Sequence, residues 1–212
     1  MKNFITIKEN ISSEIVEKKS KFIANLFYVE TVQEAEQIIK QINKKYFDAR
    51  HNCIAYRIVE DEQIVEKSSD NGEPSGTAGA PMLNILQKNN LANVLIIVTR
   101  YFGGILLGTG GLVRAYSNSL LRAIENSTII EKCIGQELEV TLVYSEFENF
   151  KYYCKNNDIN IVDSKYSENI VCKIEAQEVQ KQRLMKDFQT KSINLIDIKG
   201  LSKKYITKSK EK

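Results

Sequence analysis

The chain has 212 residues, 42% of them hydrophobic and 27% charged, which is typical of a soluble globular protein of one or two domains. A single histidine excludes a histidine-based metal cluster, and four widely spaced cysteines form neither a C-x-x-C zinc pattern nor a disulfide framework. The net charge of +3 comes from the segment 199–212, which holds six lysines and one acid, so the remaining chain does not resemble a basic nucleic-acid binder.

The sequence predicts neither a membrane-spanning segment nor a signal peptide, and we therefore expect a cytoplasmic protein. No apolar run reaches the roughly 18–20 residues that a membrane-spanning helix needs, and the opening MKNFITIKENISSE has no apolar signal-peptide core. We therefore expect a reduced protein with no membrane contact, metal or cofactor. The lysine-rich end is interpreted as a solvated terminus, with attraction to RNA or ribosomes as the alternative.

Hydrophobic periodicity predicts alternating strands and helices in the first half of the chain. We expect strands over 22–29, 52–60 and 93–101, helices over 31–45, 77–88 and 111–125, and a polar loop over 68–76. The first helix opens with the capping box Thr31-Val-Gln-Glu34. The strand 93–101 is an apolar, β-branched run, which predicts burial on both of its faces.

The pattern changes near residues 127–136, where a second unit begins. We expect strands over 137–143, 159–165, 169–175 and 192–198, with helices over 145–156 and 176–190. This βαββαβ order is the ferredoxin-like plan. The sequence therefore predicts an α+β protein with domains over residues 1–130 and 136–205, followed by a basic tail over 206–212.

Glycine is concentrated in one part of the chain. Eight of the ten glycines, and both prolines, lie between Gly72 and Gly111. Glycine permits positive φ and close backbone approach, and irregular loops on regular elements often carry binding groups. Two glycine clusters on either side of a buried strand therefore predict one tightly turned recognition surface.

The junction at Gly110-Gly111 has the features of an anion site. A helix N-terminus offers unpaired N–H groups and a positive dipole end. Arg114 follows one turn later, and Arg100 ends the preceding strand. The glycine spacing fits neither a P-loop nor a dinucleotide fingerprint. The alternative is that both arginines pair with carboxylates of the same chain, such as Asp70 or Glu73.

Five further side chains near the glycines are candidates for a functional or a structural role. Asp70 and Glu73 share a turn, where paired carboxylates suit acid–base or magnesium chemistry but also suit a solvated turn. His51 is expected to face a ligand as a donor, and Cys53, two residues along the same strand, to be structural. Tyr101 either stacks on a ring or closes the core.

Three segments carry a family resemblance: ARHNCIAYR at 49–57, DNGEPSGTAG at 70–79 and RYFGGILLGTGGLVRA at 100–115. Together they resemble the signature of the IMPACT/YigZ family, and the second half is similar to the smaller domain of its bacterial members. The resemblance implies an N-terminal domain of the left-handed βαβ superfamily, shared with domain two of ribosomal protein S-five and the GHMP kinases. It also implies a ferredoxin-like C-terminal domain similar to the last domain of elongation factor G.

The resemblance further implies a role in translation. Eukaryotic relatives regulate translation by binding the Gcn-one scaffold and thereby restraining the Gcn-two kinase. This chain lacks their N-terminal RWD domain, so that partner is not expected here. Asn71 stands where the family often has a second acid, which weakens a metal interpretation of the turn.

We predict a non-enzymatic cytoplasmic protein that acts in translation or its regulation and contacts RNA, the ribosome or a translation factor. The alternatives are a protein or enzyme for a small phosphorylated ligand, and a pure protein-interaction module. No catalytic residue is assigned, and no oligomeric state is predicted. The expected binding residues are His51, Asp70, Glu73, Thr77, Arg100, Tyr101, Gly103, Gly104, Gly108, Gly110, Gly111 and Arg114.

Overall fold

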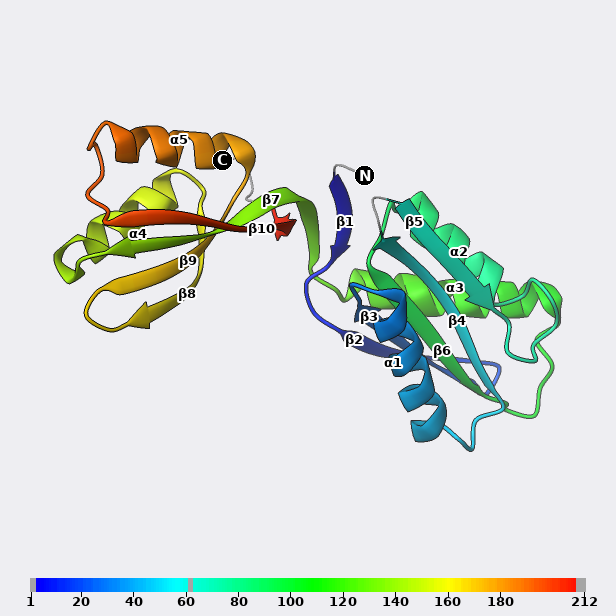
Figure 1. Ribbon diagram of the computed structural model, residues 1–212. Helices are drawn as coiled ribbons and strands as arrows, with labels where there is room; N and C mark the ends of the chain where they lie inside the picture. The colour runs from blue at the N-terminus through cyan, green and yellow to red at the C-terminus, as the bar shows by residue number, and fades with distance from the viewer. Residues whose placement is uncertain (1–2, 61–62, 209–212) are drawn as a thin grey trace. The chain divides into compact units, whose positions relative to one another are not determined.

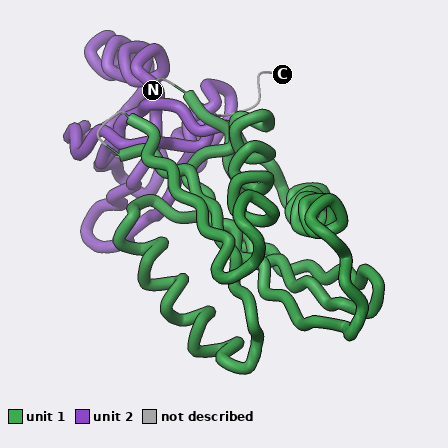
Figure 2. The backbone as a smooth tube through the Cα atoms, turned by 90° about the vertical axis from the view of Figure 1, so that its right-hand side faces the viewer, with its two compact units in different colours: residues 1, 3–130 green, residues 2, 131–212 purple. Residues whose placement is uncertain are grey.

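The computed structural model describes residues 3–60 and 63–208, which form two compact units (Figures 1 and 2). Unit 1 extends to Ile130, and unit 2 begins at Glu131. The division lies inside the segment 127–136, where the sequence pattern changes. Residues 131–135 are not a linker, because strand β7 (Ile129–Leu142) already runs through them.

The described residues of unit 1 form one antiparallel sheet with three helices. Its strand order is β2-β3-β6-β4-β5. The strands are β2 (Ile11–Glu17), β3 (Ser20–Tyr28), β4 (His51–Glu60), β5 (Gln63–Ser69) and β6 (Val94–Tyr101). The short strand β1 (Asn3–Ile7) contacts the same unit through a parallel bridge from Ile5 to Leu91. β3 and β4 both run antiparallel to β6, so they are parallel to each other and α1 connects them. The handedness of this connection stays a prediction.

The helices of unit 1 cover both faces of this sheet (Figure 1). They are α1 (Val32–Lys45), α2 (Gly79–Lys88) and α3 (Thr109–Glu125). Side chains alternate along a strand, so Cys53 and Ala55 of β4 belong to the core under α2 and α3, while Ile54 and Tyr56 belong to the core under α1. β6 is buried in the same two-sided way, as its apolar sequence predicts.

Three strands of unit 1 were not expected from the sequence: β1, β2 and β5. Two of them, β2 and β5, are the edge strands of the sheet, and their half-exposed sequences ISSEIVE and QIVEKSS have weak apolar signals. The Thr31 cap is confirmed, since its hydroxyl accepts from the Glu34 N–H. Helix α3 begins at Thr109, earlier than expected, so Gly110 and Gly111 lie in its first turn rather than at the loop junction.

Unit 2 has the predicted ferredoxin-like plan. Its elements are β7, α4 (Phe147–Asn156), β8 (Asn160–Tyr166), β9 (Ile170–Ala176), α5 (Glu178–Gln189) and β10 (Asp197–Thr207). Among the strands of unit 2 the order is β10-β7-β9-β8, and these neighbours are all antiparallel. One core joins the sheet and both helices, including Leu138, Phe150, Ile174 and Leu184. The protein is thus an α+β protein of two units.

Two details of unit 2 differ from the expectation. The helix expected from residue 145 instead opens with a short 3₁₀ turn, Tyr144–Glu146, which is followed directly by α4. The basic tail expected from residue 206 begins later, because β10 continues to Thr207 and Lys208 pairs with Glu131. Residues 209–212 lie outside the described residues. None of the helices that the structure describes has the length and apolarity to cross a membrane.

Because each unit has its own core, we expect unit 1 to fold without unit 2. A fragment of residues 1–132 should show the circular dichroism of an α+β fold and a single cooperative melting transition. A fragment that is unfolded, under conditions in which the full chain is folded, would show that the boundary is misplaced.

Candidate functional site

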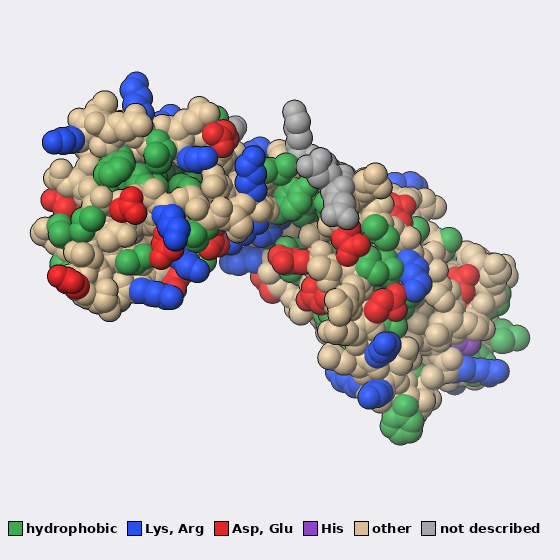
Figure 3. All heavy atoms as spheres, viewed as in Figure 1, with side chains coloured by type: hydrophobic (Ala, Val, Ile, Leu, Met, Phe, Trp, Pro, Cys, Tyr) green, Lys and Arg blue, Asp and Glu red, His purple; other side chains and the backbone are tan. Residues whose placement is uncertain are grey.

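Unit 1 contains a pocket of about 380 Å³ at the ends of its central strands. It is lined by Arg50, His51, Glu73, Pro74, Arg100, Phe102, Leu106, Leu107, Gly108, Thr109 and Leu112. These residues come from the starts of β4 and α3, the end of β6, and the two loops 70–78 and 102–108. In the space-filling view, the histidine lies beside protruding hydrophobic and basic side chains (Figure 3). All three motif segments of the sequence therefore meet at one pocket.

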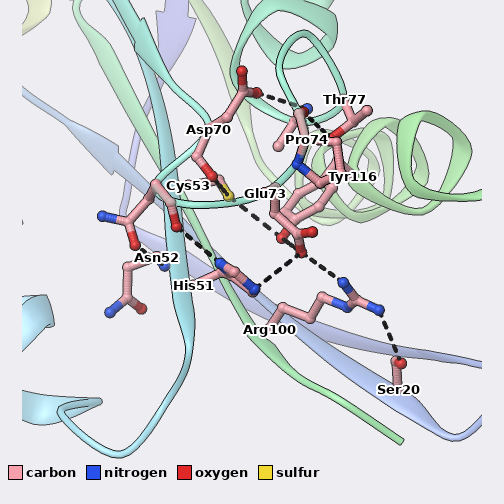
Figure 4. A network of polar contacts seen from close by, with 12 residues as sticks. Ser20, His51, Asn52, Cys53, Asp70, Glu73, Pro74, Thr77, Arg100 and Tyr116 are labelled. Carbon is pink, nitrogen blue, oxygen red and sulfur yellow. Dashed lines mark hydrogen bonds and ion pairs between the residues drawn. The ribbon is translucent and has the colours of Figure 1, made fainter. Parts of the chain in front are cut away.

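A buried ion pair forms the polar floor of the pocket (Figure 4). The side chains of Glu73 and Arg100 are only 3% and 7% exposed, and Glu73 Oε1 accepts from Arg100 Nη1 at 2.7 Å. The same oxygen accepts from the Tyr116 hydroxyl at 2.8 Å. The guanidinium lies 5.4 Å from the Phe22 ring centroid and 5.7 Å from that of Phe102. Arg100 is thus held by charge, hydrogen bonding and two aromatic rings.

His51 presents one ring nitrogen to the pocket floor. Its Nδ1 lies 2.8 Å from the carbonyl oxygen of Asn71. A carbonyl can only accept, so Nδ1 carries the hydrogen. The other nitrogen, Nε2, lies 3.9 Å from Glu73 Oε1. The neutral imidazole therefore offers an acceptor at Nε2, and the protonated ring forms an ion pair with Glu73.

Cys53 is a buried structural thiol, as expected. Its Sγ lies 2.9 Å from the Asp70 carbonyl oxygen and 3.3 Å from the Tyr116 hydroxyl. Burial raises the pKa of Cys53 to about 12, so the reactive thiolate is not formed near neutral pH. Burial also raises the pKa of Tyr116, which keeps its hydroxyl protonated and able to donate to Glu73.

The two carboxylates of the turn have different environments. Glu73 faces the pocket, whereas Asp70 braces its own loop by accepting from the N–H groups of Gly76, Ala78 and Gly79 at 2.8–2.9 Å. Asp70 thereby caps the start of α2, where no side chain of the helix does so. Thr77 also acts within the loop, since its hydroxyl donates to the Pro74 carbonyl at 2.6 Å.

Unit 1 should become less stable in acid, in part because the Asp70 carboxylate becomes protonated. Partial burial raises the pKa of Asp70, but the three N–H donors outweigh that effect and leave it below its usual value. A lowered folded-state pKa stabilises the fold above the unfolded value of about 4, and this contribution is lost as the pH falls through the folded value.

The measurement compares the melting temperatures of the wild type and Asp70→Asn between about pH 7 and pH 2. The wild type should be the more stable protein at neutral pH, and the difference should shrink as the solution is acidified. A constant difference across this range would show that the Asp70 charge does not stabilise the loop.

The loop 102–108 is held in place by its glycines. The N–H of Gly103 donates to the Ser20 hydroxyl, and a Cβ at Gly103 would overlap the backbone of Lys19. Gly104 and Gly108 have φ of +83° and +72°, which disfavour other residues.

This braced loop displays apolar side chains. Phe102 is 50%, Ile105 43% and Leu106 82% exposed. We call these three residues the apolar rim.

The remaining expected residues lie apart from the pocket floor. Arg114 bonds to the Gly110 carbonyl through Nε and, with Gly111 and Lys18, lines a second hollow of about 240 Å³. The Tyr101 hydroxyl donates to Asp48. The structure therefore gathers His51, Glu73, Arg100 and Gly108 at one pocket and places Arg114 at another.

Sequence reasoning did not name several residues of the pocket as binding residues, among them Arg50, Leu106 and the supporting Tyr116. A signal was present for Leu106, because the run Ile105-Leu-Leu107 is apolar yet lies between two glycine pairs, where solvated residues are usual. Tyr116 carried no distinguishing signal, since it occupies an ordinary core position of α3.

The sequence of unit 1 matches a known domain. A model of the Impact N-terminal domain matches residues 18–124. The chain is also 40% identical over 168 residues to the IMPACT family member YvyE of Bacillus subtilis, covering 79% of this chain and 77% of that protein. The chain belongs to the IMPACT family.

Both units of this IMPACT family chain have counterparts elsewhere. It is 31% identical over 198 residues to the IMPACT family member YigZ of Escherichia coli, covering 92% of this chain and 94% of YigZ. A solved structure described as that of an hypothetical protein has a TM-score of 0.62 and 29% identity, covering 92% of this chain and 97% of the other. The similarity to YigZ and to this solved structure therefore extends over both units of the chain.

Proposed function

We propose that this protein acts in translation or its regulation as a binding protein, and that the apolar rim of unit 1 contacts a protein of the translation apparatus. The resemblance seen in the sequence supports the first part, because it includes eukaryotic translation regulators. The segments that carry this resemblance, 49–57, 70–79 and 100–115, are those that build the pocket and its rim.

The exposure of the apolar rim is the observation that carries the proposal. Leu106 is 82% exposed on a loop whose start is anchored by the hydrogen bond from the Gly103 N–H to the Ser20 hydroxyl. Exposed apolar side chains that cluster on an ordered surface mark contact sites. Aromatic and aliphatic anchors surrounded by polar groups are typical of protein interfaces.

An RNA contact at this surface is less well supported. Binding to nucleic acid depends on several free cations that neutralise phosphates. Arg100 is engaged by Glu73, and Arg114 lies in the second hollow, so the two arginines expected to hold phosphates do not act together. The proposal therefore favours a protein partner, with RNA as an outcome that the experiment distinguishes.

The experiment measures binding of the immobilised full chain to three preparations: purified ribosomes, protein-free ribosomal RNA, and purified translation factors. Binding to ribosomes or factors, but not to bare RNA, is expected. Leu106→Gln should weaken it about tenfold, since an interface anchor contributes on the order of 1–2 kcal/mol.

The matched control is Leu121→Gln, because Leu121 is a partly exposed leucine of α3 that does not line the pocket. This variant should bind like the wild type. Equal binding by both variants would contradict a contact through the rim. Binding to bare RNA that weakens steeply as the salt concentration rises would indicate that the partner is RNA and not a protein.

A further inference from the structure

We infer that the pocket of unit 1 binds a small molecule in which a carboxylate or phosphate group is joined to an apolar portion. The volume of about 380 Å³ lies within the range of about 300–1,000 Å³ that is usual for small-molecule sites. This inference goes beyond the proposed role in translation, since it concerns the interior of the pocket rather than a macromolecule on its rim.

The polar part of the pocket has hydrogen-bond donors that the protein leaves unused. The Nε–H of Arg100 is buried and has no partner among the residues that the structure describes. The side chain that carries it is more than nine-tenths buried, and it lines the pocket. Buried donors are almost always satisfied in folded proteins. Because Nε itself is covered, a ligand oxygen would satisfy it after a small movement of the Arg100 side chain.

The start of α3 adds further donors to the pocket lining. Gly108 and Thr109, the N-cap and first residue of α3, both line the pocket. The first-turn N–H groups have no acceptor within a helix, and none of the side chains that the structure describes caps this one. The positive end of the helix dipole favours an anion at this point. The free donors of Arg100 and of α3 therefore require the same kind of group.

The charges that line the pocket also favour an anion. The charge of Glu73 is offset by Arg100, and its Oε1 additionally accepts from Tyr116. Arg50 is exposed and forms no ion pair with any described residue. His51 is neutral or positive, so it adds no negative charge. One unpaired guanidinium and a helix N-terminus remain for the ligand.

The remaining lining of the pocket is apolar. It is formed by Pro74, Phe102, Leu106, Leu107 and Leu112. A ligand that consisted only of an anion would leave this surface in contact with water. A ligand with an apolar portion would cover it, which is favourable in proportion to the area buried.

The test titrates four probes into the full chain by calorimetry: phenyl phosphate, benzoate, inorganic phosphate and phenol. Phenyl phosphate or benzoate should bind with a Kd of about 1 mM or lower, and at least about tenfold more tightly than inorganic phosphate or phenol. Failure of both aromatic anions to bind at about 10 mM would overturn the inference. This result would leave the rim contact untouched, since no macromolecule is present.

Two pairs of variants test whether the probe binds in this pocket. Thr109→Pro removes one N–H, and proline is well tolerated at the first position of a helix; Thr109→Ala keeps the N–H. Arg50→Gln removes the free cation, whereas Arg122→Gln removes an exposed arginine of α3 outside the pocket.

Thr109→Pro and Arg50→Gln should each weaken binding about fivefold or more, as expected for charge-assisted or dipolar contacts. Thr109→Ala and Arg122→Gln should bind like the wild type. If Thr109→Pro does not melt like the wild type, the Arg50 pair alone decides. Affinity unchanged in Arg50→Gln would overturn the site.

Discussion

Replacing Glu73 by alanine should lower the free energy of unfolding of unit 1 by about 3–5 kcal/mol. The substitution removes the carboxylate from a pair whose side chains are 3% and 7% exposed, which leaves the Arg100 charge buried without its counter-ion. It also removes the acceptor of the Tyr116 hydroxyl. The cost of an unpaired buried charge is larger than the net contribution of the pair itself.

The matched control for this prediction is Glu36→Ala. Glu36 pairs with Lys67 at 2.7 Å, the same distance as in the buried pair, but both partners are exposed. An exposed ion pair contributes about 1 kcal/mol or less. Urea unfolding of the two variants and the wild type gives the comparison. Similar losses in both variants would show that burial of the Glu73–Arg100 pair is not what makes it important.

Gly103→Ala should be the most damaging of the glycine substitutions in the loop 102–108. Its Cβ would overlap the backbone of Lys19 and Ser20, in the turn between β2 and β3. Backbone atoms cannot move aside as a flexible side chain can, so the turn or the loop must shift. We expect a loss of about 1–3 kcal/mol or more, together with displacement of the apolar rim.

Gly110→Ala is the matched control, because Gly110 lies inside α3 and a Cβ there would meet no atom within 4 Å. Alanine is favoured over glycine inside a helix by about 1 kcal/mol, so this variant should be as stable as the wild type or more stable. Thermal melting of both variants provides the measurement. A destabilised Gly110→Ala together with a tolerant Gly103→Ala would reverse the expected order.

The sequence predicts the interior of the fold better than its edges. β6 is apolar from Val94 to Val98 because helices cover both faces of the sheet, so its burial can be predicted from these residues. The edge strands β2 and β5 face solvent along much of their length, so polar side chains are tolerated there and the strand pattern is weak.

The candidate site shows a similar limit. Glycine clustering predicts that the two loops form one surface, and the structure brings them to one pocket. The separate roles of Asp70 and Glu73 were not predictable, because the two carboxylates lie only three positions apart in one turn. The first accepts from backbone N–H groups, whereas the second accepts from an arginine 27 residues away. Pairings of this kind depend on tertiary contacts, which local sequence does not encode.

The most direct test of the central claim places a photo-reactive residue at position 106 of the full chain in living cells. Leu106 is the most exposed member of the apolar rim, and position 121 serves as the control site. Irradiation should link position 106, but not 121, to a ribosomal protein or translation factor identified by mass spectrometry. Crosslinks from position 106 only to RNA, only to proteins outside translation, or equally from both positions would contradict the claim.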